Sequence, residues 1–116
     1  MVFKLDSDGN ESVLYAFGGG ADGANPWAGL IRDATGNLYG TTIFGGNNSN
    51  SCPFAGSGCG VVFKVDSSGK ETVLYTFTGG ADGALPQAGL LAYQGALYGT
   101  TYGGGAYGYG VVFKLQ

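Results

Sequence analysis

Residues 2–17 read VFKLDSDGNESVLYAF, and the chain repeats them at residues 62–77 as VFKVDSSGKETVLYTF. Two further stretches recur in the same order: GGADGANPWAGL at 19–30 returns as GGADGALPQAGL at 79–90, and GNLYGTT at 36–42 returns as GALYGTT at 95–101. VVFKV at 61–65 appears again as VVFKL at 111–115. A period of about 50 residues is typical of repeat architectures, and an insertion of about nine residues lengthens the first copy. Residues 1–116 are therefore expected to form one segment, with a first repeat over about residues 2–60, a second over about 61–110 and an extra strand at 111–116.

Each repeat is predicted to contain four short β-strands separated by turn residues. The strands are expected at residues 2–6, 12–17, 28–34, 37–43, 61–66, 72–77, 88–93, 96–102 and 111–116. Asp8-Gly9, Thr35-Gly36 and Ser68-Gly69 lie between neighbouring strands, as short hairpins require. Both faces of these strands carry apolar or small side chains, which indicates sheets covered on both sides. Four-stranded antiparallel units at this period predict an all-β fold, a β-propeller with two blades in this chain.

The composition agrees with a turn-rich β protein and excludes several functions. The 116 residues include 25 Gly, too many for a helical protein, because each Gly inside a helix costs about 1 kcal/mol relative to Ala. The absence of His excludes Ser-His-Asp triads and imidazole metal sites. A formal charge of −3 with only five bases argues against nucleic acid as a partner. No apolar run approaches the ~20 residues of a membrane-spanning helix, so membrane insertion is not expected.

The repeated motifs resemble the Gloeobacter/Verrucomicrobia (GloVer) repeat. The resemblance rests on G-x-V-F-K-L-D-x-x-G-x-E-x-V-L-Y-x-F, on G-G-x-D-G-A-x-P-x-A-G-L and on G-N-L-Y-G-T-T, and it covers nearly the whole chain. The insertion at 47–58 departs from the pattern. The resemblance implies a bacterial repeat protein with a propeller-like fold that is secreted or held on the cell surface. It implies no known activity, and no catalytic residues carry over from it.

Two repeats are too few to close a propeller, which needs at least about four blades. The strand order leaves the last sheet without its fourth strand, and it leaves the first sheet with only its last two strands. Exposed sheet edges invite pairing with another chain. We therefore expect a head-to-tail homo-oligomer, with a trimer favoured over a tetramer or a dimer. One of the equivalent strands 2–6 and 111–116 is then redundant, either displaced or added outside. The alternative is that the chain is a fragment of a longer repeat array.

The long, irregular loops are expected on one face of this fold, which we call the loop face: residues 19–27, 44–60, 79–87 and 102–109. The short turns at 6–11, 34–37, 66–71 and 94–96 form the opposite turn face. Function tends to lie on irregular loops held by a rigid scaffold. Aromatic rings that stack on sugars, beside amides that bond sugar hydroxyls, predict a carbohydrate site on the loop face. The candidate residues are Trp27, Asn25, Phe44, Phe54, Gln87, Tyr102, Tyr107 and Tyr109. The alternative for Trp27 and the tyrosines is packing inside the protein.

Asp22 and Asp82 lie in identical Ala-Asp-Gly contexts on the loop face. They are weak candidates for Ca²⁺ ligands or for the paired carboxylates of a glycosidase. The competing interpretation is a turn in which each carboxylate bonds the N–H groups of its own loop, and repetition in both copies favours it. No other cofactor or metal ion is expected.

Cys52 and Cys59 lie within the insertion and are predicted to form a local disulfide in an oxidising compartment. We expect a ligand-binding, lectin-like module that takes carbohydrate on the loop face. One alternative is a glycan-active hydrolase that uses the loop aspartates, so whether the chain is an enzyme stays open, with binding favoured. The other alternative is a structural or protein-interaction repeat without a small ligand.

Overall fold

The computed structural model describes residues 1–47, 51–54 and 56–116, and in these ranges the chain is all-β. Its strands form three separate antiparallel sheets. The N-terminal sheet contains β1 (Val2–Leu5) and β2 (Glu11–Tyr15). The middle sheet contains β3 (Ala24–Pro26), β4 (Ile31–Arg32), β5 (Leu38–Phe44), β6 (Val61–Val65) and β7 (Glu71–Thr76). The C-terminal sheet contains β8 (Leu91–Tyr93), β9 (Ala96–Thr100) and β10 (Val112–Leu115).

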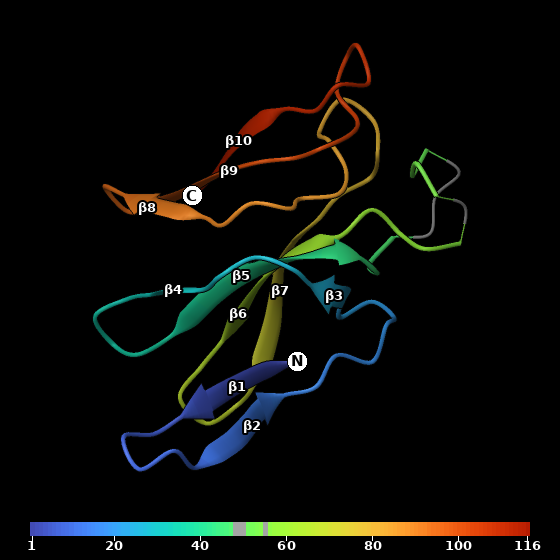
Figure 1. Ribbon diagram of the computed structural model, residues 1–116. Helices are drawn as coiled ribbons and strands as arrows, with labels where there is room; N and C mark the ends of the chain where they lie inside the picture. The colour runs from blue at the N-terminus through green and yellow to red at the C-terminus, as the bar shows by residue number, and fades with distance from the viewer. Residues whose placement is uncertain (48–50, 55) are drawn as a thin grey trace.

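The sheets follow the strand order that the repeats predict. The short hairpin turns lie at one end of the strands and the long connections at the other. In Figure 1 the hairpin turns gather on the left, whereas the long connections gather on the right. The described residues form no helix that could cross a membrane.

The strands expected at 28–34 and 88–93 are shorter than predicted. The expected strand at 28–34 is represented by β4 alone, and β3 pairs with the same neighbour, β5, further along. Asn25 has a φ of 58° and Pro26 has no N–H to donate, so the ladder between β3 and β5 is short. In the second repeat β8 covers residues 91–93, and Ala84 forms an isolated bridge with Gly103.

Three hairpin turns on the turn face are each stabilised by an aspartate at the same position of the turn. Asp6, Asp33 and Asp66 each accept hydrogen bonds from the backbone N–H groups two and four residues later, at 2.9–3.0 Å. In each turn the residue three positions after the aspartate has a positive φ, between 85° and 91°, which glycine adopts without strain. These glycines are Gly9, Gly36 and Gly69. The turn chemistry is therefore encoded locally and repeats with the sequence.

The middle sheet is buried on both faces, as the apolar strands predict. Val61, Phe63 and Val65 face the N-terminal sheet and pack with Val2. On the opposite face, Val62 belongs to a cluster that includes Ile43, Phe77, Leu85 and Leu90 and that packs against residues of the C-terminal sheet. This arrangement places most of the fully buried side chains in and around β6.

Phenylalanine rings connect successive sheets in the same way in both repeats. Phe17 packs edge-on against Phe63 with 4.9 Å between ring centroids, and Phe77 packs against Phe113 at 5.2 Å. Each receiving ring lies over a glycine on the paired strand, because a Cβ at Gly40 would come 2.8 Å from the Phe63 ring. The glycine of the LYGTT motif is thus required for the ring to pack closely on the sheet.

Candidate functional site

The loops that form the loop face are joined by backbone hydrogen bonds that recur in both repeats. Gly46 donates its N–H to the carbonyl of Gly20 at 2.8 Å, and Gly105 donates to the carbonyl of Gly80 at 2.8 Å. The first bond ties the loop after β5 to the loop after β2, and the second ties the loop after β9 to the loop after β7. The loop face is therefore a connected surface positioned by the sheets.

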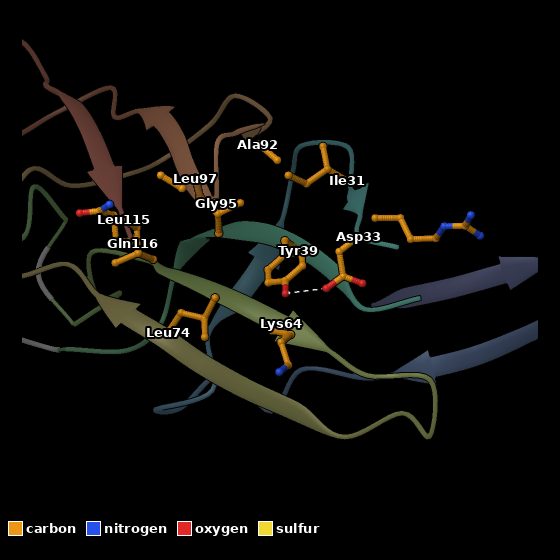
Figure 2. Close-up of a pocket in the computed structure, with 12 residues that line it drawn as sticks. Ile31, Asp33, Tyr39, Lys64, Leu74, Ala92, Gly95, Leu97, Leu115 and Gln116 are labelled. Carbon is orange, nitrogen blue, oxygen red and sulfur yellow. Dashed lines mark hydrogen bonds between the residues drawn. The ribbon is translucent and has the colours of Figure 1, made fainter. Parts of the chain in front are cut away.

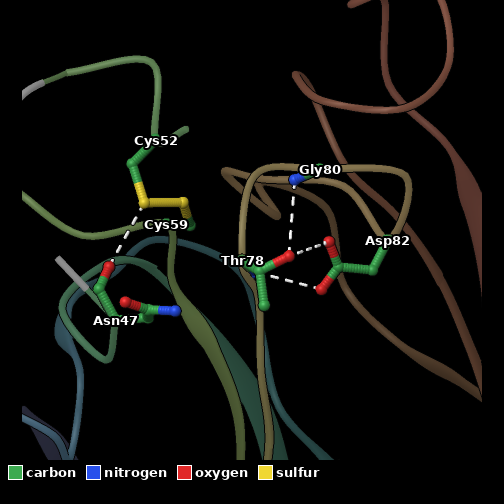
Figure 3. The surroundings of a disulfide bond; sticks show 6 residues. All are labelled: Asn47, Cys52, Cys59, Thr78, Gly80 and Asp82. Carbon is green, nitrogen blue, oxygen red and sulfur yellow. Dashed lines mark hydrogen bonds between the residues drawn. A yellow bond between two sulfur atoms is a disulfide. The ribbon is translucent and has the colours of Figure 1, made fainter. Parts of the chain in front are cut away.

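The insertion in the first repeat lies against the loop face of the second. Cys52 and Cys59 form the predicted disulfide, with their Cα atoms 5.1 Å apart (Figure 3). The carbonyl of Cys59 accepts a hydrogen bond from the N–H of Leu85 at 2.8 Å. A Cβ added at Gly79 would collide with the carbonyl oxygen of Ser51. The disulfide is compatible with an oxidising compartment, and it stiffens the segment that contacts the second repeat.

Asp22 is committed to its own loop. Its carboxylate accepts hydrogen bonds from the Gly18 N–H at 2.7 Å, from the Tyr15 hydroxyl at 2.8 Å and from the Gly20 N–H at 3.2 Å. The Gly18 bond is the largest cause that lowers the pKa of Asp22 below its ordinary value. The hydrogen bond that the Tyr15 hydroxyl donates to Asp22 raises the pKa of Tyr15 to about 12. This is the turn-forming arrangement.

Asp82 repeats the arrangement in the second repeat. Its carboxylate accepts hydrogen bonds from the Thr78 hydroxyl at 2.6 Å and from the Thr78 N–H at 2.9 Å (Figure 3). It also accepts one from the Tyr75 hydroxyl at 2.8 Å. Burial raises the pKa of Asp82, but these hydrogen bonds outweigh burial and lower it overall. A general acid needs the opposite shift. Among the described residues, no three His, Cys, Asp or Glu side chains gather as metal ligands would.

Three of the predicted ligand-binding residues line one hollow on the loop face. Gln87 comes from the loop before β8, Tyr102 follows β9, and Tyr109 lies in the glycine-rich connection to β10. The hollow has a volume of about 670 Å³, and its other lining residues are small. Tyr102 and Tyr109 are both exposed, so their rings are accessible to a ligand. Two aromatic faces and one amide are the chemistry that the sequence predicted for this face.

Phe54 of the insertion extends this arrangement on the other side of Tyr102. Tyr102 also lines a second hollow of about 340 Å³, together with Phe54 and Pro53. The ring of Phe54 is exposed, and it contacts the partly buried Phe44 edge-on at 6.0 Å between centroids. The partly buried ring of Phe44 therefore supports the exposed ring of Phe54. Tyr102 is the residue shared by both hollows.

The family of the chain follows from its repeats. The family model of the Gloeobacter/Verrucomicrobia repeat matches residues 1–116. The chain belongs to this repeat family. No curated protein and no solved structure matches it. The description of the Gloeobacter/Verrucomicrobia repeat names no ligand and no activity, so the function has to be argued from the site.

Besides Phe44, three predicted residues of this Gloeobacter/Verrucomicrobia repeat chain lie outside the two hollows. Trp27 is 73% exposed, so it does not pack inside this chain. Tyr107 is exposed as well. Asn25 lines a separate hollow of about 360 Å³ beside Phe17 and Pro26. Trp27 is therefore not part of the hollow in which the second repeat gathers two tyrosines around Gln87.

The turn face carries a hollow that was not predicted from the sequence. It measures about 410 Å³ and lies between the middle and C-terminal sheets, where Tyr39 donates its hydroxyl hydrogen to Asp33 at 2.9 Å (Figure 2). Its walls are mostly apolar, with Lys64 at its edge. The signal in the sequence was the small Ala92 of the second repeat at the position of Arg32 in the first.

Proposed function

We propose that this chain is a two-repeat segment of a β-propeller that binds carbohydrate on its loop face, outside the cytoplasm. The observation that carries the proposal is the hollow shared by Gln87, Tyr102 and Tyr109. A sugar ring presents C–H groups on one face and hydroxyls at its edge. Tyrosine rings cover the first, and an amide side chain bonds the second.

The propeller part of the proposal is supported by the arrangement of the sheets. The described strands form three antiparallel sheets packed one on another, and the middle sheet holds the equivalents of all four predicted strands. The strand order is the same in the parts of the repeat that the two outer sheets represent. Radially repeated four-stranded sheets with their loops on one side are the construction of a β-propeller.

Carbohydrate binding is favoured over carbohydrate hydrolysis because the carboxylates of Asp22 and Asp82 already accept hydrogen bonds from their own loops. The hydrogen bonds that Asp22 and Asp82 accept lower the pKa of each, whereas a glycosidase acid must keep its proton near neutral pH. The rings of Tyr102 and Tyr109 are exposed beside the hollow, where a sugar ring can stack on them. Binding without turnover is the function that this chemistry supports.

The proposal is tested by glycan-array binding of the purified chain and of Tyr109→Ala and Gln87→Ala. Tyr93→Ala is the matched control, because Tyr93 is an exposed tyrosine at the opposite end of the same sheet. We expect the chain to bind a subset of glycans. Loss of one stacking ring should weaken that binding by about tenfold, since it removes on the order of 1 kcal/mol.

Trp27→Ala reports whether the first repeat contributes a second contact. Circular dichroism of every variant checks that the fold is unchanged. If no glycan or polysaccharide is bound, or if Tyr93→Ala weakens binding as much as Tyr109→Ala does, the carbohydrate proposal is wrong. A purely structural or protein-interaction role for the repeat would then remain.

A further inference from the structure

The strand sequence Val-Phe-Lys-Leu occurs at both ends of the chain, as β1 and as β10, and each copy buries a different face. In the middle strand β6 the equivalent Val62 and Phe63 are fully buried, on opposite faces of the sheet. In β1, Val2 is only 3% exposed, whereas Phe3 is 53% exposed. In β10, Val112 is 80% exposed, whereas Phe113 packs against Phe77. The face that β10 leaves uncovered is therefore the face that β1 buries.

The strands β1 and β10 each pair on one side only within the described residues. The middle strand β6 pairs with β5 on one side and with β7 on the other, whereas β10 pairs with β9 and β1 pairs with β2. In the β1–β2 pair Val2 lies opposite Tyr15 and Phe3 opposite Val13, with a register shift between them. The β6–β7 pair repeats this register and this shift. Because β10 has the sequence of β1, it can pair with β2 in the same register.

Space for such a strand exists beside β10. A hollow of about 340 Å³ runs along Val111–Leu115 and is bounded by Tyr75 and Phe77. In the N-terminal sheet, Leu14 and Tyr15 of β2 are partly buried, because the β6–β7 hairpin lies over them and Gly69 approaches the Leu14 carbonyl. The equivalent residues of β7 are exposed. What β7 lacks is the cover that a fourth strand beside β10 would provide.

We propose that β10 of one copy of this chain takes the place of β1 in a second copy. The strand β2 of the second copy then pairs with β10, completes the C-terminal sheet of the first copy and covers β7. Val112 enters the apolar environment that Val2 occupies beside Val61 and Phe63 in the second copy. The number of ladder bonds is conserved in the exchange, while the exposed faces of β7 and β10 become buried.

The contact is head-to-tail, so successive exchanges close a ring where the rotation between copies allows it. Of the two equivalent strands at the ends of the chain, β1 is therefore the redundant one, and β10 displaces it. This inference does not depend on carbohydrate binding, because it involves the sheet edge and leaves the loop face free.

The exchange is tested by native mass spectrometry and sedimentation of the chain over a range of concentrations, with variants at Lys114. The N–H and carbonyl of Val111 bond Thr101 on the side of β9. Since the bonding direction alternates along an antiparallel strand, the N–H of Lys114 points to the free edge. Lys114→Pro removes that donor where an edge strand tolerates proline, and Lys114→Ala keeps it. We expect the chain and Lys114→Ala to assemble and Lys114→Pro to assemble at least about tenfold more weakly.

A cross-linking experiment tests the register. A copy with Ser12→Cys is mixed with a copy with Lys114→Cys, because the β1–β2 register pairs Lys4 with Ser12 and so places Lys114 there after exchange. The two native cysteines are bonded to each other, so the introduced thiols react alone. A short thiol cross-linker should join the two kinds of copy in the mixture and should not join Ser12→Cys copies to each other. A chain that keeps the mass of one copy at all concentrations, a Lys114→Pro variant that assembles as well as Lys114→Ala, or an oligomer without the mixed cross-link would overturn the inference.

Discussion

Replacing Glu71 with glutamine should stabilise the chain at alkaline pH and leave its stability unchanged in acid. Glu71 begins β7, and its Oε2 atom is buried without a hydrogen-bond partner among the described residues. Burial, together with the negative charge of Asp22, raises the pKa of Glu71 from 4.5 to about 7. The folded chain therefore disfavours the ionised carboxylate.

The sign of the effect follows from proton linkage. The folded state holds the Glu71 proton up to about pH 7, whereas the unfolded state releases it near pH 4.5. The stability that this proton contributes is fully present below pH 4.5 and is lost as pH rises through 7. Above that range the folded chain must carry an unfavourable charge, which the neutral amide of the Glu71→Gln variant would remove.

The magnitude has an upper bound set by the size of the shift. One pKa unit corresponds to about 1.4 kcal/mol, so a rise from 4.5 to about 7 corresponds to at most roughly 3.4 kcal/mol. The carboxyl group is only partly removed from water, and solvent screening reduces this figure to about 1 kcal/mol. For a chain of this size, about 1 kcal/mol shifts the melting temperature by about 4 °C.

The assay is urea unfolding followed by circular dichroism at about pH 4 and about pH 8. Glu11→Gln is the matched control, because Glu11 is the equivalent residue of the first repeat and is exposed at the start of β2. We expect Glu71→Gln to exceed the wild-type chain by about 1 kcal/mol at the higher pH only. A difference that is equal at both pH values, or one that Glu11→Gln reproduces, would refute the reasoning.

Two further predictions concern the insertion. Gly79→Ala should destabilise the chain by about 1–3 kcal/mol more than Gly19→Ala, because both glycines have a φ of 83° but only a Cβ at residue 79 meets the Ser51 carbonyl. Thermal unfolding of the two variants measures the difference, and equal losses would mean that the insertion does not pack on the second repeat. Replacing Cys52 and Cys59 together by alanine should cost about 2 kcal/mol, because the bridge closes a short loop of seven residues' separation. Urea unfolding of this variant beside the reduced wild-type chain tests this, and a loss in the variant without one on reduction would point to packing rather than to the bridge.

Much of the fold could be predicted because its determinants are local. The order of the strands, the aspartate-glycine turns and the disulfide each depend on residues close together in the chain, and all of them agree with the structure. The expected strand at 28–34 is reduced to β4, and the short strand β3 before it was missed because the positive φ of Asn25 and the pairing of Pro26 are not visible in a pattern of apolar residues. The candidate residues were predicted as one group, but the sequence did not show which of them lie together. Tyr102 and Tyr109 line one hollow with Gln87, and Trp27 does not line it.

The sequence by itself determined that this chain is a repeated, all-β protein, since the motif that forms each strand and each turn is written at least twice. Only the tertiary structure decided which copy of a motif is enclosed. Val2 is buried and Val112 is exposed within identical strands, and Glu71 has a perturbed pKa beside a sheet that covers it while Glu11 is exposed. The physical reason is that turn and strand formation depend on near neighbours in the chain, whereas burial depends on how many sheets lie on each side. Two repeats leave two sheets covered on one side only.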